Sequence, residues 1–384
     1  MILNNFLLKN IKMNIVPNRD LDFSGIPRDS NLRNKFNDIV AESDFEQTLI
    51  RLLPKYLPVS FIEGFALVQK IAEPYVAPGL YFSPNSQSNT TYNFAAATAV
   101  DRLGAHIVTS QHGGGDGQFQ ILFSEYLARR CSDYYISFGW QDSYYDGATV
   151  VPFSSAELSR MVKRNQTKVV NVKGLFVSTT GNPYFYRGDH WASMGGFEIY
   201  FNDQLAFLGH LENNIRNHMK YRPYPPNNLG WEETLDRLRE RFPEILVVEN
   251  ENIVDALNTA KIIVIDHNIT TLLKAMAMNR PVVCYWQPLL YPFRTECVAD
   301  FEKLREVGIL YDNPESAAQH VNSIWQKIDG WWQSDSVQKA RNTFVAKYAR
   351  TTTDVAIQWR AMLLRIARDA QTNTSPITGQ KRRV

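Results

Sequence analysis

Cysteine is scarce in this chain of 384 residues, which has three, Cys131, Cys284 and Cys297, with no CxxC pair among them. A sparse and odd set excludes a disulfide framework and favours a reducing compartment. Apolar runs of about 18 residues are also missing, so we expect no transmembrane helix. The N-terminal segment lacks a small-residue cleavage site and is not interpreted as a signal peptide. These absences predict a cytoplasmic location, where any membrane association is peripheral, at the inner face of the inner membrane.

An excess of either charge is missing as well, because 41 Lys and Arg residues face 39 Asp and Glu residues, for a net charge of +2. This balance predicts no nucleic-acid partner, since such proteins concentrate basic residues. Apolar residues, in contrast, make up 44% of the chain, and aromatic residues are plentiful, with 21 Phe, 18 Tyr and 8 Trp. The chain can therefore bury sizeable cores, and at roughly 150 residues per domain its length suggests two domains.

Short apolar strands alternate with helical segments along most of the chain. Strands are predicted at 105–110, 134–140, 173–179, 261–265 and 281–286. Helices are predicted between them, as in a protein with parallel βαβ units. The alternation therefore predicts an α/β fold class.

The order of these segments divides the chain into three parts. An N-terminal Rossmann-like domain is expected over 1–170 and a C-terminal Rossmann-like domain over 171–345. A C-terminal helix and a disordered tail are expected over 346–384. Within this plan, 141–168 is predicted as a loop with a solvated helix, and 335–367 as one helix.

The junction at the end of the 261–265 strand is the most informative segment. The strand leads into Asp266, His267 and Asn268, and a helix is predicted to begin near Thr270 and Thr271. Ligands bind at the carboxyl ends of parallel strands, and the first turn of a helix attracts phosphate. A histidine can donate to an anion when protonated. The alternative is plain N-capping by Asn268 or Thr270, and the pattern alone does not decide between the two.

A glycine-rich segment follows the 105–110 strand, with the order Gln111, His112, Gly113, Gly114 and Gly115. Glycines without side chains let the backbone approach a ligand closely. The spacing matches neither the dinucleotide fingerprint nor the P-loop. A flexible turn is the structural alternative, but the position at a strand's carboxyl end favours a binding loop.

Candidate catalytic acids and metal ligands are less well marked. The carboxylates considered are Glu125, Glu157, Glu232, Glu233 and Asp266. Arg222, at the end of a predicted strand, can pair with a phosphate or carboxylate through its planar fork, or form a structural ion pair. The seven histidines show no HxxxH or Cys/His ligand spacing, so no metal is expected.

Several motifs in a specific order resemble a family of bacterial surface-polysaccharide transferases. They are Gln111–Gly117 with Glu125, Asp133 and Phe138-Gly139-Trp140; Tyr221-Arg222-Pro223-Tyr224 with Leu229-Gly230-Trp231; Asp266-His267 with Thr270-Thr271; Asn279-Arg280-Pro281; and Ala340-Arg341. The resemblance spans roughly residues 55–350. It implies the B-type glycosyltransferase fold (GT-B), which has two Rossmann-like domains, here with a helical C-terminal extension.

The family is similar to the retaining β-Kdo glycosyltransferases, which use CMP-activated 3-deoxy-manno-octulosonate (Kdo). The resemblance implies transfer of Kdo, or a related ulosonic acid, from a CMP-sugar donor to a glycan or lipid-linked glycan of lipopolysaccharide or capsule. It implies that Arg222 and the 266–271 segment bind the donor, with His267, Thr270 and Thr271 at its phosphate. The glycine loop would face them across a cleft. No metal or other cofactor is expected, since a CMP-sugar carries a single phosphate.

One position departs from the family pattern. An acidic residue is expected two positions before Gly230-Trp231, and this sequence has Asn228 there. Retention by double displacement needs a carboxylate nucleophile. Three explanations stay open: Asn228 replaces a native acid, another acid such as Glu232 or Glu157 serves, or the alignment is shifted. The alternatives to CMP-Kdo transfer are a UDP- or GDP-sugar transferase of the same fold and a catalytically silent module for glycan assembly.

Overall fold

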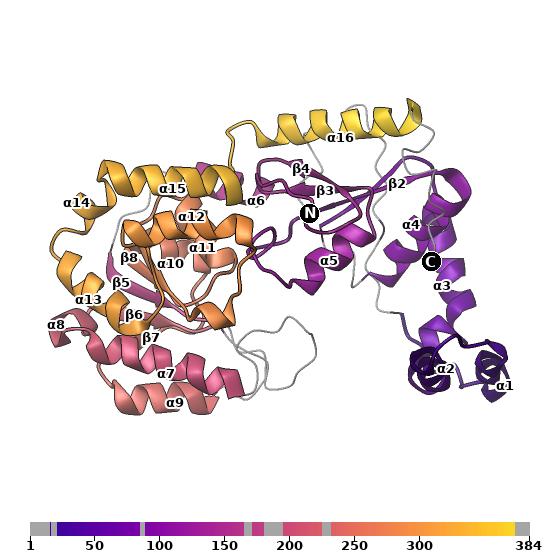
Figure 1. Cartoon of the computed structure of the whole chain (residues 1–384), viewed down its shortest axis with the longest axis horizontal. Helices are drawn as coiled ribbons and strands as arrows, with labels where there is room; N and C mark the ends of the chain where they lie inside the picture. Colours follow the sequence, from indigo (N-terminus) through magenta and orange to yellow (C-terminus); the bar gives the residue numbers. More distant parts are fainter. Residues whose placement is uncertain are drawn as a thin grey trace. The chain divides into compact units, whose positions relative to one another are not determined.

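The computed structural model describes residues 16, 21–84, 89–164, 171–179, 195–224 and 232–372, and Figure 1 shows the elements within these ranges. The chain forms two compact units, one of Met1–Thr109 with Arg360–Val384 and one of Ser110–Trp359. The domain limits expected at residues 170 and 345 stay predictions. Among the helices of the described ranges, none is long and apolar enough to cross a bilayer.

The first unit combines helices with one parallel strand pair. Its elements are α1 (Ser30–Asn34), η1 (Lys35–Asp38), α2 (Asp44–Tyr56), η2 (Val59–Phe61), α3 (Phe65–Ala72), η3 (Glu73–Tyr75), β1 (Leu80–Ser83), α4 (Thr90–Leu103) and β2 (His106–Ser110). Strand β1 pairs with β2 in parallel. The alanines of α4, such as Ala95 and Ala99, are fully buried, and their small side chains bring the helix close to its neighbours.

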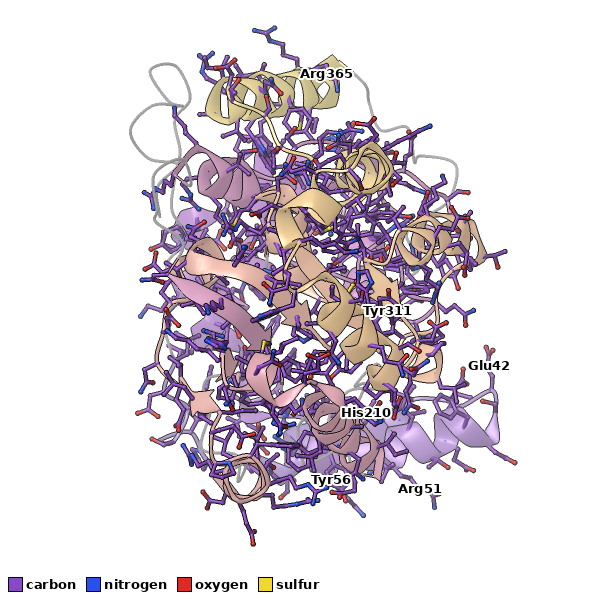
Figure 2. The ribbon with its side chains drawn as sticks, turned by 90° about the vertical axis from the view of Figure 1, so that its left-hand side faces the viewer. Glu42, Arg51, Tyr56, His210, Tyr311 and Arg365 are labelled. Carbon is purple, nitrogen blue, oxygen red and sulfur yellow. The ribbon has the colours of Figure 1, made fainter. Side chains whose placement is uncertain are left out.

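Helix α2 carries an apolar stripe that faces solvent. Phe45 is 74% exposed, Leu49 43%, Leu52 42% and Tyr56 76%. Their spacing of four, three and four residues places them on one face of the helix. Figure 2 shows the labelled Arg51 and Tyr56 of this helix at the molecular surface. The stripe is thus an apolar surface of the first unit.

The second unit begins with the glycine loop and a second parallel strand pair. The elements are α5 (Phe123–Arg130), β3 (Tyr134–Ser137), β4 (Thr149–Pro152) and α6 (Ala156–Arg164). Strand β4 pairs with β3, so the prediction of only a loop and a helix over 141–168 was wrong. The β-branched residues of Thr149-Val150-Val151 were the signal for this strand.

A six-stranded sheet forms the centre of the second unit. Its strands are β5 (Val172–Val177), β6 (Met219–Arg222), β7 (Leu246–Val247), β8 (Ala260–Ile265), β9 (Val282–Tyr285) and β10 (Leu310–Tyr311). The order is β10-β9-β8-β5-β6-β7, and every pair is parallel. This is the strand order of the Rossmann fold, and it confirms the predicted α/β class with a parallel sheet. The direction of winding reverses between β5 and β8, which is where such folds bind ligands.

Helices cover both faces of this sheet (Figure 1). One face carries α7 (Gly195–His210), α8 (Asn213–Arg216), α9 (Glu232–Arg241) and α13 (Pro314–Ile324). The other carries α10 (Ile253–Thr259), α11 (Thr270–Ala277), α12 (Thr295–Glu306) and α15 (Asp335–Tyr348). Alternate strand residues supply the two cores: Leu175 and Ile263 point into one, and Phe176 and Val264 into the other. Two further short elements are η5 (Pro288–Leu290) and α14 (Ile328–Trp332).

The single helix predicted over 335–367 was wrong, because α15 ends at Tyr348 and α16 (Val355–Thr372) begins after a break. The Arg350 N–H donates to the carbonyl of Phe138 at 2.9 Å, outside any helix. The intervening residues Thr351, Thr352 and Thr353 are β-branched and favour helices less. A tertiary hydrogen bond thus diverts the backbone at this point.

Candidate functional site

The junction between β8 and α11 lies at the carboxyl end of a strand that borders the switch point. Asp266, His267 and Asn268 follow β8 and are each only 1–2% exposed. Helix α11 begins at Thr270, and its N-cap residue Ile269 has no side-chain cap hydrogen bond. The alternative of N-capping by Asn268 or Thr270 is therefore wrong. Among the described residues no side-chain cap is found on this turn, and the Leu272 N–H donates to the Ile269 carbonyl at 3.1 Å. The remaining amides of a first helical turn are suited to an anion.

His267 is held by its neighbour in the sequence. Its Nδ1 lies 2.8 Å from Oδ1 of Asp266. Its Nε2 is buried and has no hydrogen-bond partner among the described residues. Since buried polar atoms are nearly always paired, Nε2 is available to a group bound at this junction.

Asn268 reaches the glycine-rich segment instead of the helix end. Its Nδ2 donates to Oε1 of Gln118 at 3.0 Å. Oδ1 of Asn268 and Nε2 of Gln118 are buried with no partner in the described part of the chain. The two amides together present one acceptor and one donor beside His267. No sequence pattern indicated Gln118, because this contact joins residues 150 positions apart.

The glycine loop lies directly against the start of α11. The Gly114 N–H donates to Thr270 Oγ1 at 3.1 Å. A Cβ at Gly113 would lie 2.5 Å from that oxygen, and a Cβ at Gly114 would lie 2.4 Å from the carbonyl carbon of Ile269. Glycine is thus required here by close approach. The expectation that the loop faces 267–271 across a cleft is corrected, because these segments are in contact.

Gln111 shapes the loop from within. Its Nε2 donates to the Gly113 carbonyl at 2.6 Å. Its Oε1 accepts from the Phe138 N–H and from Trp140 Nε1, both at 2.8 Å. All of its polar side-chain atoms therefore bond within the protein. His112, in contrast, is exposed.

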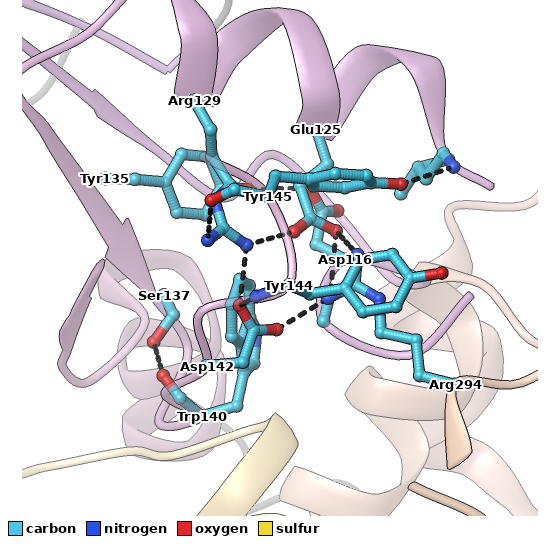
Figure 3. Close-up of polar contacts among 12 residues, drawn as sticks. Asp116, Glu125, Arg129, Tyr135, Ser137, Trp140, Asp142, Tyr144, Tyr145 and Arg294 are labelled. Carbon is cyan, nitrogen blue, oxygen red and sulfur yellow. Dashed lines mark hydrogen bonds and ion pairs between the residues drawn. The ribbon is translucent and has the colours of Figure 1, made fainter. Parts of the chain in front are cut away.

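A buried cluster of charges supports the far end of the loop (Figure 3). Glu125 Oε2 accepts from the Gly117 N–H and from Arg294 Nη2, both at 2.8 Å. Glu125 Oε1 pairs with Arg129 at 3.0 Å, and Asp142 contacts both arginines, at 2.7 Å and 2.6 Å. Glu125, a candidate acid in the sequence, is therefore a structural member of this cluster.

Arg294 also joins the cluster to the loop backbone. Its Nε donates to the carbonyl of Phe119 at 2.9 Å. Its main-chain N–H donates to the carbonyl of Gln118 at 2.8 Å. Nearby, Tyr135 donates to Oδ1 of Asp116 at 2.6 Å. Burial, and next the charge of Glu125, raises the pKa of Asp116 to about 8. Burial therefore favours the neutral acid form of Asp116 in the folded protein.

Arg222 lies at the end of β6, as predicted, and is 7% exposed. Its Nε and Nη2 donate to the main-chain carbonyl of Glu251 at 3.1 Å and 2.9 Å. Burial lowers its guanidinium pKa. The structure therefore shows one edge of the fork bound to the backbone, and donor binding by Arg222 stays a prediction.

The remaining candidate acids are placed less completely. Glu157 on α6 pairs with Lys274 of α11 at 2.9 Å, with 47% of its side chain exposed. Thr271 is half-buried in the first turn of the same helix. Asn228 lies outside the described residues, and so do the side chains of Glu232 and Glu233, although Glu232 begins α9. Within the described ranges, no three His, Cys, Asp or Glu side chains gather as a metal site, and the expectation of no cofactor stays a prediction.

The second unit is thus an α/β protein with a Rossmann-ordered sheet, and a helix whose N-cap residue makes no side-chain cap begins beside the switch point. The chain belongs to the LIC12162 family of transferases, whose family model matches residues 2–363. No curated protein matches it significantly.

Among solved structures, the chain is similar to the wall teichoic acid polymerase TagF, with 10% identity over 83% of this chain and 86% of that one, and a TM-score of 0.41. It is similar to MurG of Acinetobacter baumannii, with 12% identity over 78% and 77% and a TM-score of 0.42. It is also similar to WaaG, a glycosyltransferase involved in lipopolysaccharide biosynthesis, with 10% identity over 85% of each chain and a TM-score of 0.36. These distant similarities do not indicate what this chain binds.

Proposed function

We propose that this transferase is a glycosyltransferase that moves Kdo, or a related ulosonic acid, from a CMP-sugar to a surface-polysaccharide or lipopolysaccharide acceptor, with retention at the anomeric carbon. The observation that carries the proposal is the uncapped start of α11 beside the unpartnered Nε2 of His267. Both are suited to the single phosphate of a CMP-sugar.

The two ends of α11 support a phosphate role. At the C-terminal end, Arg341 donates from Nε to the Met276 carbonyl at 2.8 Å and from Nη2 to that of Ala277 at 3.2 Å. The helix dipole places partial positive charge at the opposite end, near Thr270. The protein thus satisfies the carbonyl end with its own cation, whereas the amide end has no side-chain cap. The phosphodiester of a CMP-sugar there gains both hydrogen bonds and charge stabilisation, and the phosphate of the departing CMP gains more as its charge rises.

In the proposed mechanism, the bond between the sugar's anomeric carbon and the CMP phosphate oxygen breaks. The electron pair leaves on the phosphate, and the amides of α11, Thr270, Thr271 and His267 stabilise that charge. A carboxylate in the 228–233 segment, or Glu157, captures or stabilises the oxocarbenium-like centre from the opposite face. An acceptor hydroxyl then attacks the anomeric carbon, any bond from that carbon to the carboxylate breaks, and the hydroxyl proton passes to solvent. A metal is not required, because one phosphate carries less charge than a diphosphate.

Product formation tests the proposal. The chain is incubated with CMP-Kdo and a glycan acceptor, alongside matched reactions with UDP- and GDP-sugars. We expect an extended glycan in the reaction with CMP-Kdo and none in the reactions with UDP- or GDP-sugars. If Asn228 replaces a native acid, the Asn228→Asp variant should transfer the sugar faster than the parent chain. If Glu232 or Glu157 is the catalytic acid instead, Glu232→Gln or Glu157→Gln, respectively, should abolish transfer. No turnover in the parent chain or in Asn228→Asp would contradict catalysis and favour a silent assembly module.

Peripheral membrane association is also part of the proposal, and α2 offers a surface for it. Its exposed stripe of Phe45, Leu49, Leu52 and Tyr56 has the amphipathic form of interfacial helices. Lys55 lies in its last turn. We expect the chain to sediment with vesicles of anionic phospholipid, and a Phe45→Ser, Tyr56→Ser double variant to stay in the supernatant. Equal sedimentation of both would argue against this surface.

A further inference from the structure

A chain of buried hydrogen bonds runs across the carboxyl ends of the central strands to His267. Tyr221 of β6 donates to Oε1 of Gln204 on α7 at 2.7 Å. Gln204 Nε2 donates to Oδ2 of Asp266 at 2.7 Å, and Asp266 Oδ1 contacts His267 Nδ1 at 2.8 Å. None of these four residues is more than 3% exposed.

The chemistry of the groups gives this chain a single direction. The Asp266 carboxylate only accepts, so Gln204 must turn its NH2 group toward it. The amide oxygen of Gln204 then faces Tyr221, which must donate. For the same reason the proton of a neutral His267 ring is on Nδ1, and the Nε2 lone pair is the free position. Nε2 becomes a donor when the ring is protonated.

The surroundings of Asp266 are polar but carry few charges. Burial raises the pKa values of Tyr200, Tyr285 and Tyr291 well above their usual range, and the charge of Asp266 raises them further. These phenols therefore stay neutral. Asp203, whose pKa is raised to about 6 first by burial, is the nearby carboxyl, and it accepts from Gln287 Nε2 at 2.9 Å. Among the described residues, His267 is the basic side chain that Asp266 contacts directly, at 2.8 Å.

We propose that Gln204 is a positioning residue: it fixes the Asp266 carboxylate so that this group accepts from the Nδ1–H of His267, and the protonated ring then donates from Nε2 to the donor phosphate. The ligand named here rests on the proposed function, whereas the state of the His267 ring does not. Gln204 lies in the middle of α7, where a buried amide serves neither helix capping nor the apolar core.

An amide is the suitable group at this position. A glutamate would place a second carboxylate against Asp266, and two such groups share one proton. While that proton is bound, the acid O–H donates to Asp266 as the amide does. Once it is lost, the two carboxylates repel and Asp266 moves. Gln204→Glu therefore makes the network depend on pH, whereas Gln204→Met, of similar length, removes the donor at every pH.

The test compares the parent chain, Gln204→Glu and Gln204→Met by CMP titration at pH 5.5 and pH 8.5. Each affinity is divided by that of the parent chain at the same pH, because the CMP phosphate itself titrates. We expect Gln204→Glu to bind within about 3-fold of the parent chain at low pH and at least about 10-fold more weakly at high pH, as for a lost hydrogen bond to a charged group. Gln204→Met should bind CMP more weakly than the parent chain at both pH values. The control Gln358→Glu changes an exposed amide that donates to the hydroxyl of Thr352 at 2.9 Å and should keep a constant ratio.

The nitrogen NMR spectrum of histidine-labelled protein, without nucleotide, separates this proposal from the function. The His267 signals, identified by their loss in His267→Ala, should show the Nδ1–H tautomer in the neutral ring. In Gln204→Glu they should match the parent spectrum at pH 5.5 and depart from it at pH 8.5. An Nε2–H tautomer, or a Gln204→Glu effect that is the same at both pH values, would overturn the positioning role. Failure of CMP to bind would overturn the proposed function, and the spectrum would still decide on Gln204.

Discussion

Two glycines show at the scale of the residue how close the loop comes to α11. A methyl group at Gly114 would lie 2.4 Å from a backbone carbon of Ile269, and backbone cannot step aside as a flexible side chain can. We expect Gly114→Ala to push the loop off the helix, to lower the free energy of unfolding by about 1–3 kcal/mol, and to weaken CMP binding.

The matched control is Gly330→Ala, since a Cβ at this position within α14 meets nothing within 4 Å. Alanine in a helix should stabilise the protein by up to about 1 kcal/mol and leave CMP binding unchanged. Urea denaturation and calorimetry measure both properties. Equal behaviour of the two variants would show that the loop does not depend on this close contact.

Asp116 gives a pH dependence at the same scale. Its folded-state pKa of about 8 lies above its ordinary value of 3.8, mainly through burial and next through the charge of Glu125. Between these values the unfolded chain is ionised and the folded chain holds the proton, so this group makes stability fall as pH rises from about 4 to 8. Asp116→Asn, whose amide oxygen can still accept from Tyr135, should not lose stability through this group as pH rises.

The measurement is the unfolding free energy of both proteins from pH 4 to 9. The unfolding free energy of Asp116→Asn minus that of the parent chain should grow as pH rises from 4 to 8 and should level off above pH 8. A difference that is constant with pH would mean that Asp116 is ionised in the folded protein.

Residue roles were predictable where neighbours in the sequence create them. The run Asp266-His267-Asn268 at the end of an apolar strand indicated the junction, and three successive glycines indicated a close approach of backbone. The partners Gln118 and Gln204 were not predictable, because each lies more than 60 positions from its contact. A buried glutamine has no pattern in a single sequence that separates it from a solvated one.

At the scale of the elements, the buried charges join the loop, α5 and the segment before α12. Arg294 has no exposed side-chain surface and pairs with Glu125 and Asp142. Removing one member of a buried ion pair leaves the others uncompensated. We expect Arg294→Met to cost about 3–5 kcal/mol of unfolding free energy.

The control for Arg294→Met is Arg239→Met. Arg239 is 46% exposed and pairs with Asp236 and Glu249, so its loss should cost no more than about 1 kcal/mol. Urea unfolding followed by circular dichroism measures both. Similar costs for the two variants would contradict the structural importance of the cluster.

Helices and strands were predictable where the sequence has a clear apolar run, and they were missed where such a run is short or interrupted. The strands at 105–110, 134–140, 261–265 and 281–286 were found where expected. Strand β4 was missed because its four residues lie in a polar, basic stretch. The break between α15 and α16 was missed because a hydrogen bond from Arg350 to distant Phe138 decides it, and local propensity carries no information about such a contact.

At the scale of the whole molecule, the family match defines a transferase, and the Rossmann-ordered sheet defines where a ligand binds in such a fold. The donor class and the catalytic carboxylate are proposals that rest on the junction at α11 and on the resemblance of the sequence motifs. The domain limits at residues 170 and 345 stay predictions, and the division between the compact units at residue 109 falls within strand β2, where composition carries no mark.

The central claim is that the start of α11 and His267 bind the phosphate of CMP, and calorimetric titration of CMP tests it most directly. The parent chain should bind one CMP, and more tightly than UDP or GDP. His267→Ala should bind at least about 10-fold more weakly. His320→Ala, which removes a half-buried histidine of α13 that packs against Tyr311 and Trp331, should bind as the parent chain does. No CMP binding by the parent chain, or equal affinity in His267→Ala, would contradict the account.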